Sequence, residues 1–319
     1  MNNNFFKVLR PGINTTYQDL GRFNMQHLGI PSGGCMDQKS FLVSNALVGN
    51  KENYGVIEFA YQGPMLKLIK GKTKIAVTGD VHFKIINSNN DVVIGECNRS
   101  YNLNEGDVID IIATNKSAYG YLSVFGGFKL KSFFDSVSTL VKSRIGPNDG
   151  NKIKIEDKII INKDSINENN FKANIFRENI NIIRVVKGPQ YNYFSEESKK
   201  KFFSQNYKIT NLTDRMGMRL QGIALENIIN TNIRSEGITK GAIQVPADGQ
   251  PIILLSDHPT IGGYPKIANI ISADYDLLVQ KTPGTNILFK CIDLLEAEQL
   301  YKNNHSNISK ILKNIEQIN

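Results

Sequence analysis

The sequence predicts a mainly β protein with a few short helices. Short apolar runs rich in β-branched and aromatic residues recur along the chain, and Gly, Asn or Asp separates them at short intervals. Of the 319 residues, 40% are hydrophobic and 21% are charged, which is the composition of a folded globular protein. A chain of this length can bury a sizeable core and can form two domains.

Several strands and one helix are expected in the N-terminal half. The clearest strand-like runs are residues 56–59, 65–69, 75–78, 108–112 and 121–125. A helix is expected from Asp37 to Val48, because Asp37 is a favourable N-cap and Gly49 can end the helix.

A hairpin is expected in the C-terminal half. Residues 243–246 and 252–255 are apolar, and the Asp-Gly pair between them is typical of a hairpin turn. Pro246 and Pro251 predict that these strands lie at a sheet edge or a bulge, because proline cannot donate a ladder hydrogen bond.

The two groups of strands predict two domains with a boundary between them. Residues 162–181 are rich in Asn, Lys and Glu and are expected to form this boundary, and two helical pieces are expected after Asp293. The predicted domains are residues 1–165, residues 182–292 and a helical tail at residues 293–319.

Charge and cysteine content narrow the class of protein. The net charge is +8, but Lys and Arg are scattered, which favours anionic small ligands and disfavours nucleic acid as a partner. The three cysteines lie far apart, so neither a disulfide framework nor a zinc site is expected. No export signal and no long apolar run are present, so we expect a cytoplasmic protein without a membrane partner.

Common catalytic motifs are absent from the sequence. The G-x-x-x-x-G-K-[ST] loop, the H-E-x-x-H helix, the G-x-S-x-G turn and the G-x-G-x-x-G fingerprint are all missing. Any ATP chemistry therefore requires another type of site or a partner protein.

Two polar, arginine-containing segments are candidates for anion binding. In residues 15–37, Arg22 and the N–H groups of several glycines could hold an anion; a structural turn in which Asp19 pairs with Arg22 is an equal alternative. In residues 213–220, Arg215 and Arg219 could clamp a carboxylate or phosphate. Asp214 and Arg219 could equally stabilise a β-turn.

Two further segments carry candidate catalytic side chains. Glu236 is a candidate base or an acceptor for a ligand amide, although an isolated Glu is more often a surface residue. In residues 256–267, adjacent glycines allow close approach of a ligand, and Lys266 with backbone N–H groups could polarise a carbonyl. The alternative is a tight bulge with Lys266 in solvent, and His258 beside Pro259 is expected to be structural.

Ordered motifs along the chain carry a family resemblance. They include Gln18-Asp19-x-Gly21-Arg22, Gly34-x-Met36-Asp37, Gly188-Pro189-Gln190, Asp214-Arg215-Met216-Gly217, Glu236-Gly237, Gly241-Ala242-Ile243-Gln244 and Gly262-Gly263-Tyr264-Pro265-Lys266. From about Val8 to Phe289 the chain resembles the KipA-type family, also called allophanate hydrolase subunit 2 or biotin-dependent carboxyltransferase-like.

The resemblance implies a fold, a reaction and partners. The fold would be two closely associated cyclophilin-like β-barrel domains, whose boundaries can interleave. The reaction would be ATP-dependent ring opening of 5-oxo-L-proline to L-glutamate, performed together with a KipI-like B subunit and an A subunit. ATP would be bound by or shared with one of these partners, and biotin is not expected on this chain.

One site in a cleft between the two domains is predicted. Catalytic roles are predicted for Asp214, Glu236, Asp257 and Lys266, and no metal is expected. Substrate-binding roles are predicted for Gln18, Asp19, Arg22, His27, Asp37, Arg215, Arg219, Gln244, Gln250, Thr260, Gly262, Gly263 and Tyr264. The chain departs from the family pattern at Val137, His258 and Pro259, where the family has Arg, Arg and Gln.

Two other functions fit the same resemblance. One is a regulatory protein that binds a KipI-like inhibitor of a kinase. The other is the carboxyltransferase component of a biotin-dependent system of the urea carboxylase type. The sequence leaves both alternatives open.

Overall fold

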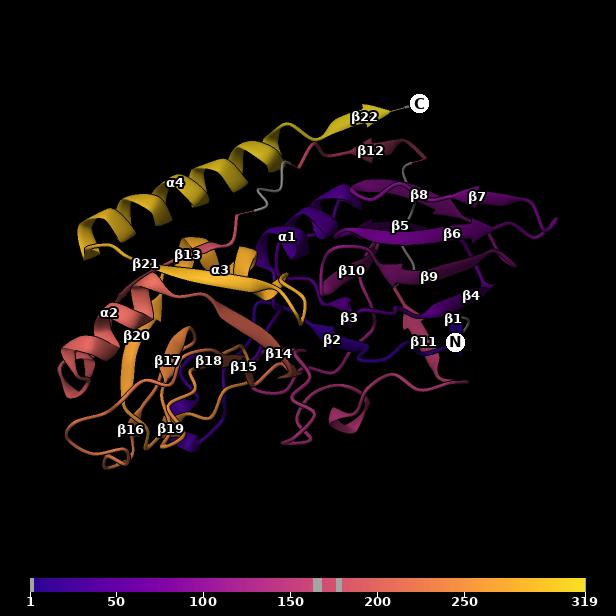
Figure 1. The fold of residues 1–319 in the computed structure, drawn as a ribbon. Helices are drawn as coiled ribbons and strands as arrows, with labels where there is room; N and C mark the ends of the chain where they lie inside the picture. Colours follow the sequence, from indigo (N-terminus) through magenta and orange to yellow (C-terminus); the bar gives the residue numbers. More distant parts are fainter. Residues whose placement is uncertain (1–2, 163–167, 176–179, 319) are drawn as a thin grey trace. The chain divides into compact units, whose positions relative to one another are not determined.

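The computed structural model describes residues 3–162, 168–175 and 180–318. Strands dominate these residues, and four α-helices accompany them, so the prediction of a mainly β protein is confirmed (Figure 1). The chain divides into two compact units, which interleave along the sequence. The first unit is Met1–Arg22, Gly33–Phe176 and Ile308–Asn319, and the second unit is Phe23–Ser32 and Arg177–Asn307.

Two short segments group with a different unit from their neighbours in the sequence. The segment Phe23–Ser32 groups with the second unit, and Ile308–Asn319 groups with the first. The expected boundary at residues 162–181 lies partly outside the described residues, and its described part contains strand β12 (Asn170–Lys172). The predicted domain ranges stay a prediction.

Two antiparallel sheets form the first unit (Figure 1). One sheet has the order β11 (Lys158–Ile161), β1 (Asn4–Arg10), β4 (Met65–Lys70), β9 (Val108–Thr114), β6 (Val81–Ile86) and β7 (Val92–Ile94). The other has the order β2 (Thr16–Gln18), β3 (Val56–Ala60), β10 (Tyr119–Val124), β5 (Thr73–Thr78), β8 (Arg99–Leu103), β12 and β22 (Glu316–Ile318). All five predicted strand-like runs coincide with strands of these sheets.

The core of the first unit lies between its two sheets. Fully buried side chains from one sheet, such as Phe6 and Leu66, share a single apolar cluster with Phe59 and Leu122 from the other. Each of these strands places alternate residues on the core face. The side chains on that face include the β-branched and aromatic residues from which the strands were predicted.

Helix α1 (Gln38–Leu47) confirms the helix expected from the sequence. Asp37 is its N-cap: the Asp37 carboxylate accepts hydrogen bonds from Ser40 N at 2.9 Å and from Ser40 Oγ at 2.6 Å. Gly49, with a φ of +78°, follows the helix in the left-handed conformation that glycine adopts without strain. Val43 and Leu47 bury the inner face of the helix.

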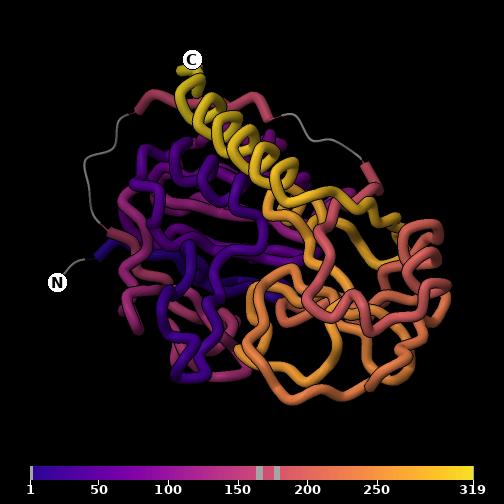
Figure 2. The backbone as a smooth tube through the Cα atoms, turned by 90° about the vertical axis from the view of Figure 1, so that its left-hand side faces the viewer, coloured from indigo at the N-terminus to yellow at the C-terminus, as the bar shows by residue number. Residues whose placement is uncertain are grey.

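A closed barrel forms the second unit. Its strands follow the order β13 (Ile182–Lys187), β20 (Lys266–Ile270), β17 (Ala242–Gln244), β18 (Ile252–Leu254), β15 (Gly217–Gln221), β14 (Tyr207–Thr213) and β21 (Asn286–Cys291). Figure 2 shows the chain of this unit, coloured from pink through orange toward yellow, from a second direction. A separate two-stranded ribbon joins β16 (Glu236–Gly237) to β19 (Ile261–Gly262).

The hairpin expected in the C-terminal half is present, but its strands are not at an edge. Strands β17 and β18 pair antiparallel with Ile243 opposite Ile253, and each has a second neighbour in the closed barrel. Pro246 and Pro251 lie in the connection, so neither removes a ladder hydrogen bond. The pairing of β17 with β20 does contain a register shift, between Ile243 and Gln244.

The C-terminal tail is one helix, so the prediction of two helical pieces was wrong. Helix α4 (Leu294–Lys313) is continuous over 20 residues. Its sequence contains neither Gly nor Pro, and Asp293 Oδ1 accepts a hydrogen bond from Glu296 N at 2.8 Å at its start. No described helix is both long and apolar enough to cross a lipid bilayer.

Two further helices cover the second unit. They are α2 (Glu196–Ser204) and α3 (Ser272–Val279). Phe202 of α2 stacks on Phe289 of β21 with the ring centroids 4.6 Å apart, and Tyr207 of β14 lies 5.9 Å from Phe289. All three rings are at most 1% exposed, so this aromatic cluster anchors α2 to the barrel.

The substitution Phe289→Ala is expected to lower the free energy of unfolding by about 3–5 kcal/mol, because it leaves a cavity beneath α2. Urea denaturation measures this loss. Phe23→Ala is the matched control, since Phe23 is 65% exposed and its removal should change stability by less than about 0.5 kcal/mol. Equal effects of the two substitutions would contradict the role given to the cluster.

Candidate functional site

A buried polar network in the first unit contains Asp19. The Asp19 carboxylate accepts three hydrogen bonds: from Ser136 Oγ at 2.7 Å, from Val137 N at 2.7 Å and from Gly21 N at 2.8 Å. Asp19 is 2% exposed. Both carboxylate oxygens therefore hold the loop that contains Val137, one of the positions at which the chain departs from its family pattern.

Gln18 extends this network. Ser138 Oγ donates to Gln18 Oε1 at 2.6 Å, and Gln18 Nε2 donates to Thr139 O at 3.1 Å. Gly34 N donates to Ser138 Oγ at 2.8 Å. Gly34 has a φ of +85°, and a Cβ at this position would lie 2.7 Å from Leu20 O, so only glycine fits here.

Arg22 is buried in the same network. It is 1% exposed, and its guanidinium donates to two backbone oxygens, Phe133 O at 3.2 Å and Ser138 O. These contacts fix the loop at residues 133–139. The predicted binding roles of Gln18, Asp19 and Arg22 remain predictions; in this structure their side chains stabilise a loop.

Asp37 and Glu58 lie at the start of α1. Asp37 is the N-cap described above, and Glu58 Oε2 accepts a hydrogen bond from Met36 N at 2.7 Å. Asp37 N donates to the hydroxyl of Tyr121 at 2.7 Å. Burial raises the pKa of Tyr121 well above its ordinary value, and the nearby Glu58 and Asp37 carboxylates raise it further. Tyr121 is therefore a neutral hydrogen-bonding partner.

Three predicted residues of the second unit, Glu236, Gln244 and Lys266, come together with Gln190, and we call these four residues the Lys266 cluster. Lys266 is 4% exposed, and its Nζ lies 2.5 Å from Glu236 Oε1. Gln190 Nε2 donates to the same oxygen at 2.8 Å, and Gln190 Oε1 accepts from Lys266 N at 3.2 Å. The alternative in which Lys266 points to solvent is therefore excluded.

Strand pairing explains why the Lys266 cluster forms. Gln244 of β17 lies directly opposite Lys266 of β20, and opposite residues of antiparallel strands project from the same face of a sheet. In the ribbon, Glu236 lies opposite Gly262. A Cβ on Gly262 would lie 2.5 Å from Gln244 Nε2, so only glycine leaves the Gln244 amide in its present position.

Glycine is also required where Gln190 approaches Lys266. A Cβ on Gly188 would lie 2.4 Å from Lys266 O. The close backbone contact places the Gln190 side chain on both Lys266 and Glu236. Gln190 was missing from the predicted site, although the Gly188-Pro189-Gln190 motif had contributed to the family resemblance.

One buried donor of the Lys266 cluster has no acceptor among the described residues. Gln244 is 6% exposed, and its Nε2 has no hydrogen-bond partner among the described residues. The hydrogen bonds from Lys266 and then Gln190 lower the pKa of Glu236 below its ordinary value, which keeps this carboxyl ionised. Such a group of buried donors suits a ligand that presents carboxylate or carbonyl oxygens.

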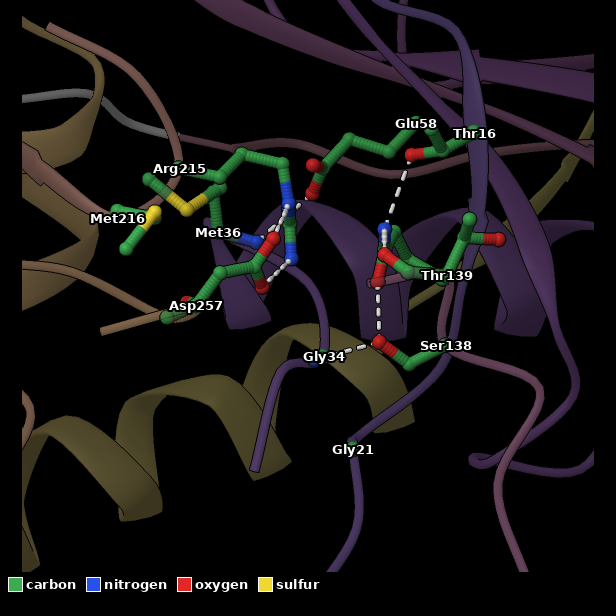
Figure 3. Close-up of polar contacts among 12 residues, drawn as sticks. Thr16, Gly21, Gly34, Met36, Glu58, Ser138, Thr139, Arg215, Met216 and Asp257 are labelled. Atoms are coloured by element: carbon green, nitrogen blue, oxygen red, sulfur yellow. Dashed lines mark hydrogen bonds and ion pairs between the residues drawn. The ribbon is translucent and has the colours of Figure 1, made fainter. Parts of the chain in front are cut away.

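The two arginines predicted to form one clamp have different partners. Arg215 makes a bidentate pair with Asp257, with Nε to Oδ2 at 2.9 Å and Nη2 to Oδ1 at 2.8 Å (Figure 3). Arg219 instead lies 3.3 Å from Asp248 in an exposed ion pair. Asp214 Oδ1 accepts from Met216 N at 2.8 Å, so Asp214 stabilises the turn before β15.

The remaining predicted residues of the second unit are not part of the Lys266 cluster. Gln250 makes two hydrogen bonds to the backbone of Gly222, at 2.9 and 3.2 Å. His27 lies in an exposed 3-10 turn, Gln26–Leu28, and Tyr264 is 40% exposed. Thr260 O accepts from Ile238 N at 3.2 Å. Within the described part of the chain, no group of three or more His, Cys, Asp or Glu residues could hold a metal ion.

Comparisons with known proteins give consistent matches. A family model described as "Carboxyltransferase domain, subdomain A and B" matches residues 28–291. The C subunit of the 5-oxoprolinase of Haemophilus influenzae is 32% identical over 307 residues, which cover 95% of this chain and 96% of the relative. The protein of the same name from Escherichia coli is 31% identical, and the match covers 91% of this chain and 92% of that relative.

Solved structures of larger enzymes also match. The urea carboxylase of Kluyveromyces lactis has a TM-score of 0.88 at 27% identity, and the match covers 98% of this chain and 29% of that enzyme. The urea amidolyase of K. lactis has the same TM-score and identity, and this chain spans only 20% of it.

Asp19→Ala is expected to lower the free energy of unfolding by at least about 1–3 kcal/mol, because it removes the acceptor of Ser136 Oγ, Val137 N and Gly21 N. Amide hydrogen exchange should become faster at Val137. Asp248→Ala is the control, because it removes an exposed ion pair and should cost less than about 1 kcal/mol. An unchanged rate of amide hydrogen exchange at Val137 would contradict the stabilising role of Asp19 in this loop.

His258 is expected to make the second unit acid-sensitive. It is 5% exposed, and its Nδ1 donates to Pro259 O at 2.6 Å. Burial, and then the nearby Lys240, lower the pKa of His258 below its ordinary value of 6.5. The unfolded chain therefore binds this proton at a higher pH than the folded chain, so stability is full above about pH 6.5 and falls as the pH decreases below it.

Replacing His258 by Gln should reduce this dependence on pH. Urea denaturation of both proteins at about pH 7.5 and about pH 5.5 measures the difference. The original chain should lose more stability than His258→Gln between these two values. An equal loss in both proteins would show that other groups cause the acid sensitivity.

Proposed function

Because the chain belongs to the family of carboxyltransferase domains, subdomains A and B, we propose that it is the C subunit of an ATP-dependent 5-oxoprolinase. Two bacterial relatives of that name support the proposal, since each matches the chain over nine-tenths or more of both lengths. The reaction would open the lactam ring of 5-oxo-L-proline to give L-glutamate.

The observation that carries the proposal is the Lys266 cluster. A buried ammonium and two amide side chains, those of Gln190 and Gln244, gather at one place in the second unit. The proposed substrate has a lactam carbonyl and a carboxylate, so it presents acceptors that match these donors. Of the three carboxylates with predicted catalytic roles, Glu236 contacts Lys266, whereas Asp257 pairs with Arg215 and Asp214 stabilises a turn.

The need for ATP follows from the stability of the lactam amide. Transfer of the γ-phosphoryl group of ATP to the lactam carbonyl oxygen would release ADP and make the carbonyl carbon electrophilic. Water then adds to that carbon, the ring C–N bond breaks, and the nitrogen takes up a proton. Loss of phosphate to a second water leaves the new carboxylate of glutamate.

We also propose that the chain acts together with partner proteins. A KipI-like B subunit and an A subunit would complete the enzyme, and ATP would be bound by or shared with one of them. This assignment is supported by the lack of a G-x-x-x-x-G-K-[ST] loop in the chain. We place the complex in the cytoplasm, where ATP is available and where cysteines that form no disulfide among the described residues are expected.

The urea carboxylase relatives favour a second candidate function. In that case the chain would transfer a carboxyl group from biotin on another protein to an amide nitrogen of the urea type. The structural match to the K. lactis enzymes supports this candidate. Carboxyl transfer from a biotinylated carrier protein to urea, measured with labelled bicarbonate, distinguishes it from the lactam hydrolase.

Co-expression with the A and B subunits tests the proposed function. The purified complex should release glutamate from 5-oxo-L-proline only when ATP is present, with one ADP formed for each glutamate. A complete complex that hydrolyses no 5-oxo-L-proline would contradict the proposal.

Within this complex, Lys266→Met is expected to lower the rate of glutamate release by about 100-fold or more, because it removes a buried charge that contacts the substrate. Lys208→Met is the matched control, since Lys208 is an exposed residue of β14 and should retain full activity. Thermal unfolding of both variants separates loss of function from loss of fold. Activity of Lys266→Met within a few-fold of the original would rule out this role.

A further inference from the structure

A single carboxylate oxygen lies between two buried donors in the Lys266 cluster. Glu236 Oε1 lies 2.5 Å from Lys266 Nζ and accepts a hydrogen bond from Gln190 Nε2 at 2.8 Å. Lys266 and Gln190 are 4% and 8% exposed, so both donors are buried. The second unit therefore contains a preformed binding position for one anionic oxygen.

Two donor groups of the cluster have unused hydrogen-bonding capacity. The Nε2 group of Gln244 is buried beneath Gly262 and has no hydrogen-bond partner among the described residues. For Lys266 Nζ, these residues offer no acceptor besides Glu236. Buried amide and ammonium groups normally have partners, so the cluster has the capacity to bind a second oxygen.

Glu236 can leave its position more easily than the donors around it. Its side chain is 43% exposed, whereas that of Lys266 is 5% exposed. Glu236 belongs to β16, a strand of two residues whose partner is β19, and the neighbouring Gly237 has open space where a Cβ would lie. Water can solvate the Glu236 carboxylate after a side-chain rotation, but it cannot reach a buried ammonium in the same way.

The group that replaces Glu236 must carry a negative charge. Removing one partner of a buried ion pair leaves the other charge uncompensated, which is strongly unfavourable. A neutral carbonyl oxygen could accept the hydrogen bond from Gln190, but it would leave the charge of Lys266 unbalanced. A carboxylate balances the charge, and its second oxygen can accept the hydrogen bond that Gln244 offers.

We infer that Lys266, Gln190 and Gln244 form a carboxylate-binding subsite, which Glu236 occupies in this structure as an internal competitor. The substrate displaces the Glu236 carboxylate and places its own carboxylate against Lys266. For the identity of this ligand the inference rests on the proposed function, and it assigns Lys266 to the carboxylate of 5-oxo-L-proline. The sequence-based expectation had assigned Lys266 to the negative charge that develops at the lactam carbonyl.

The substitution Glu236→Gln tests this subsite in the full-length chain. Glutamine keeps the shape of the side chain and removes the competing charge. Calorimetric titration with 5-oxo-L-proline and with acetate should show binding at least about tenfold tighter than in the original chain, because the subsite is no longer self-occupied. Binding of 2-pyrrolidinone, the lactam without a carboxylate, should not become tighter.

Three further variants make the test specific. Glu197→Gln removes an acidic group that is 73% exposed and paired with Lys201, and it should leave all affinities unchanged. Gln244→Met should weaken carboxylate binding without lowering thermal stability, since it removes a donor that has no partner in the described chain. In the Glu236→Gln background, Lys266→Met should abolish the gain in affinity.

The outcomes separate this inference from the proposed function. If Glu236→Gln binds neither acetate nor 5-oxo-L-proline more tightly than Glu197→Gln, the subsite is wrong, even if the assembled complex releases glutamate. If Glu236→Gln binds acetate more tightly but the complex hydrolyses no 5-oxo-L-proline, the subsite stands and the proposed substrate is wrong. Loss of activity in Glu236→Gln without tighter binding would identify Glu236 as a proton-transfer group instead.

Discussion

The burial of the Lys266 ammonium is the constraint on which the organisation of the second unit's site depends. A charge that is 4% exposed requires an anion beside it, because an unpaired ion inside a protein costs several kcal/mol. Glu236 supplies the anion, and Gln190 holds both groups in place. The glycines at positions 188 and 262 then follow, since a side chain at either would collide with the backbone of Lys266 or the amide of Gln244.

The first unit uses polar side chains for a different purpose. Gln18, Asp19 and Arg22 are as buried as Lys266, but the contacts seen here join them to the backbone and hydroxyl groups of the loop at residues 133–139. A buried carboxylate that accepts three hydrogen bonds fixes a loop firmly. The first unit thus contains a loop fixed by buried side chains, and the second contains a cluster in which the buried donor Gln244 Nε2 has no partner among the described residues.

Local sequence patterns predicted the strands, helix α1 and the family, and these predictions are confirmed. The strands are rich in β-branched and aromatic residues, and Asp37 with Gly49 marks both ends of α1. The environment of Lys266 could not be predicted, because it depends on Gln190, which is 76 residues away, and on the register that places Gln244 opposite. The contacts of Arg22 could not be predicted for the same reason, since its carbonyl partners come from a distant loop.

The oxygen position beside Lys266 is thus the central feature of the second unit: it is made for a carboxylate, and Glu236 fills it when the substrate does not. A crystal structure of the full chain with 5-oxo-L-proline tests this claim most directly. The substrate carboxylate should lie within hydrogen-bond distance of Lys266 Nζ, and the Glu236 side chain should have turned toward solvent. A bound substrate located elsewhere, with Glu236 still against Lys266, would contradict it.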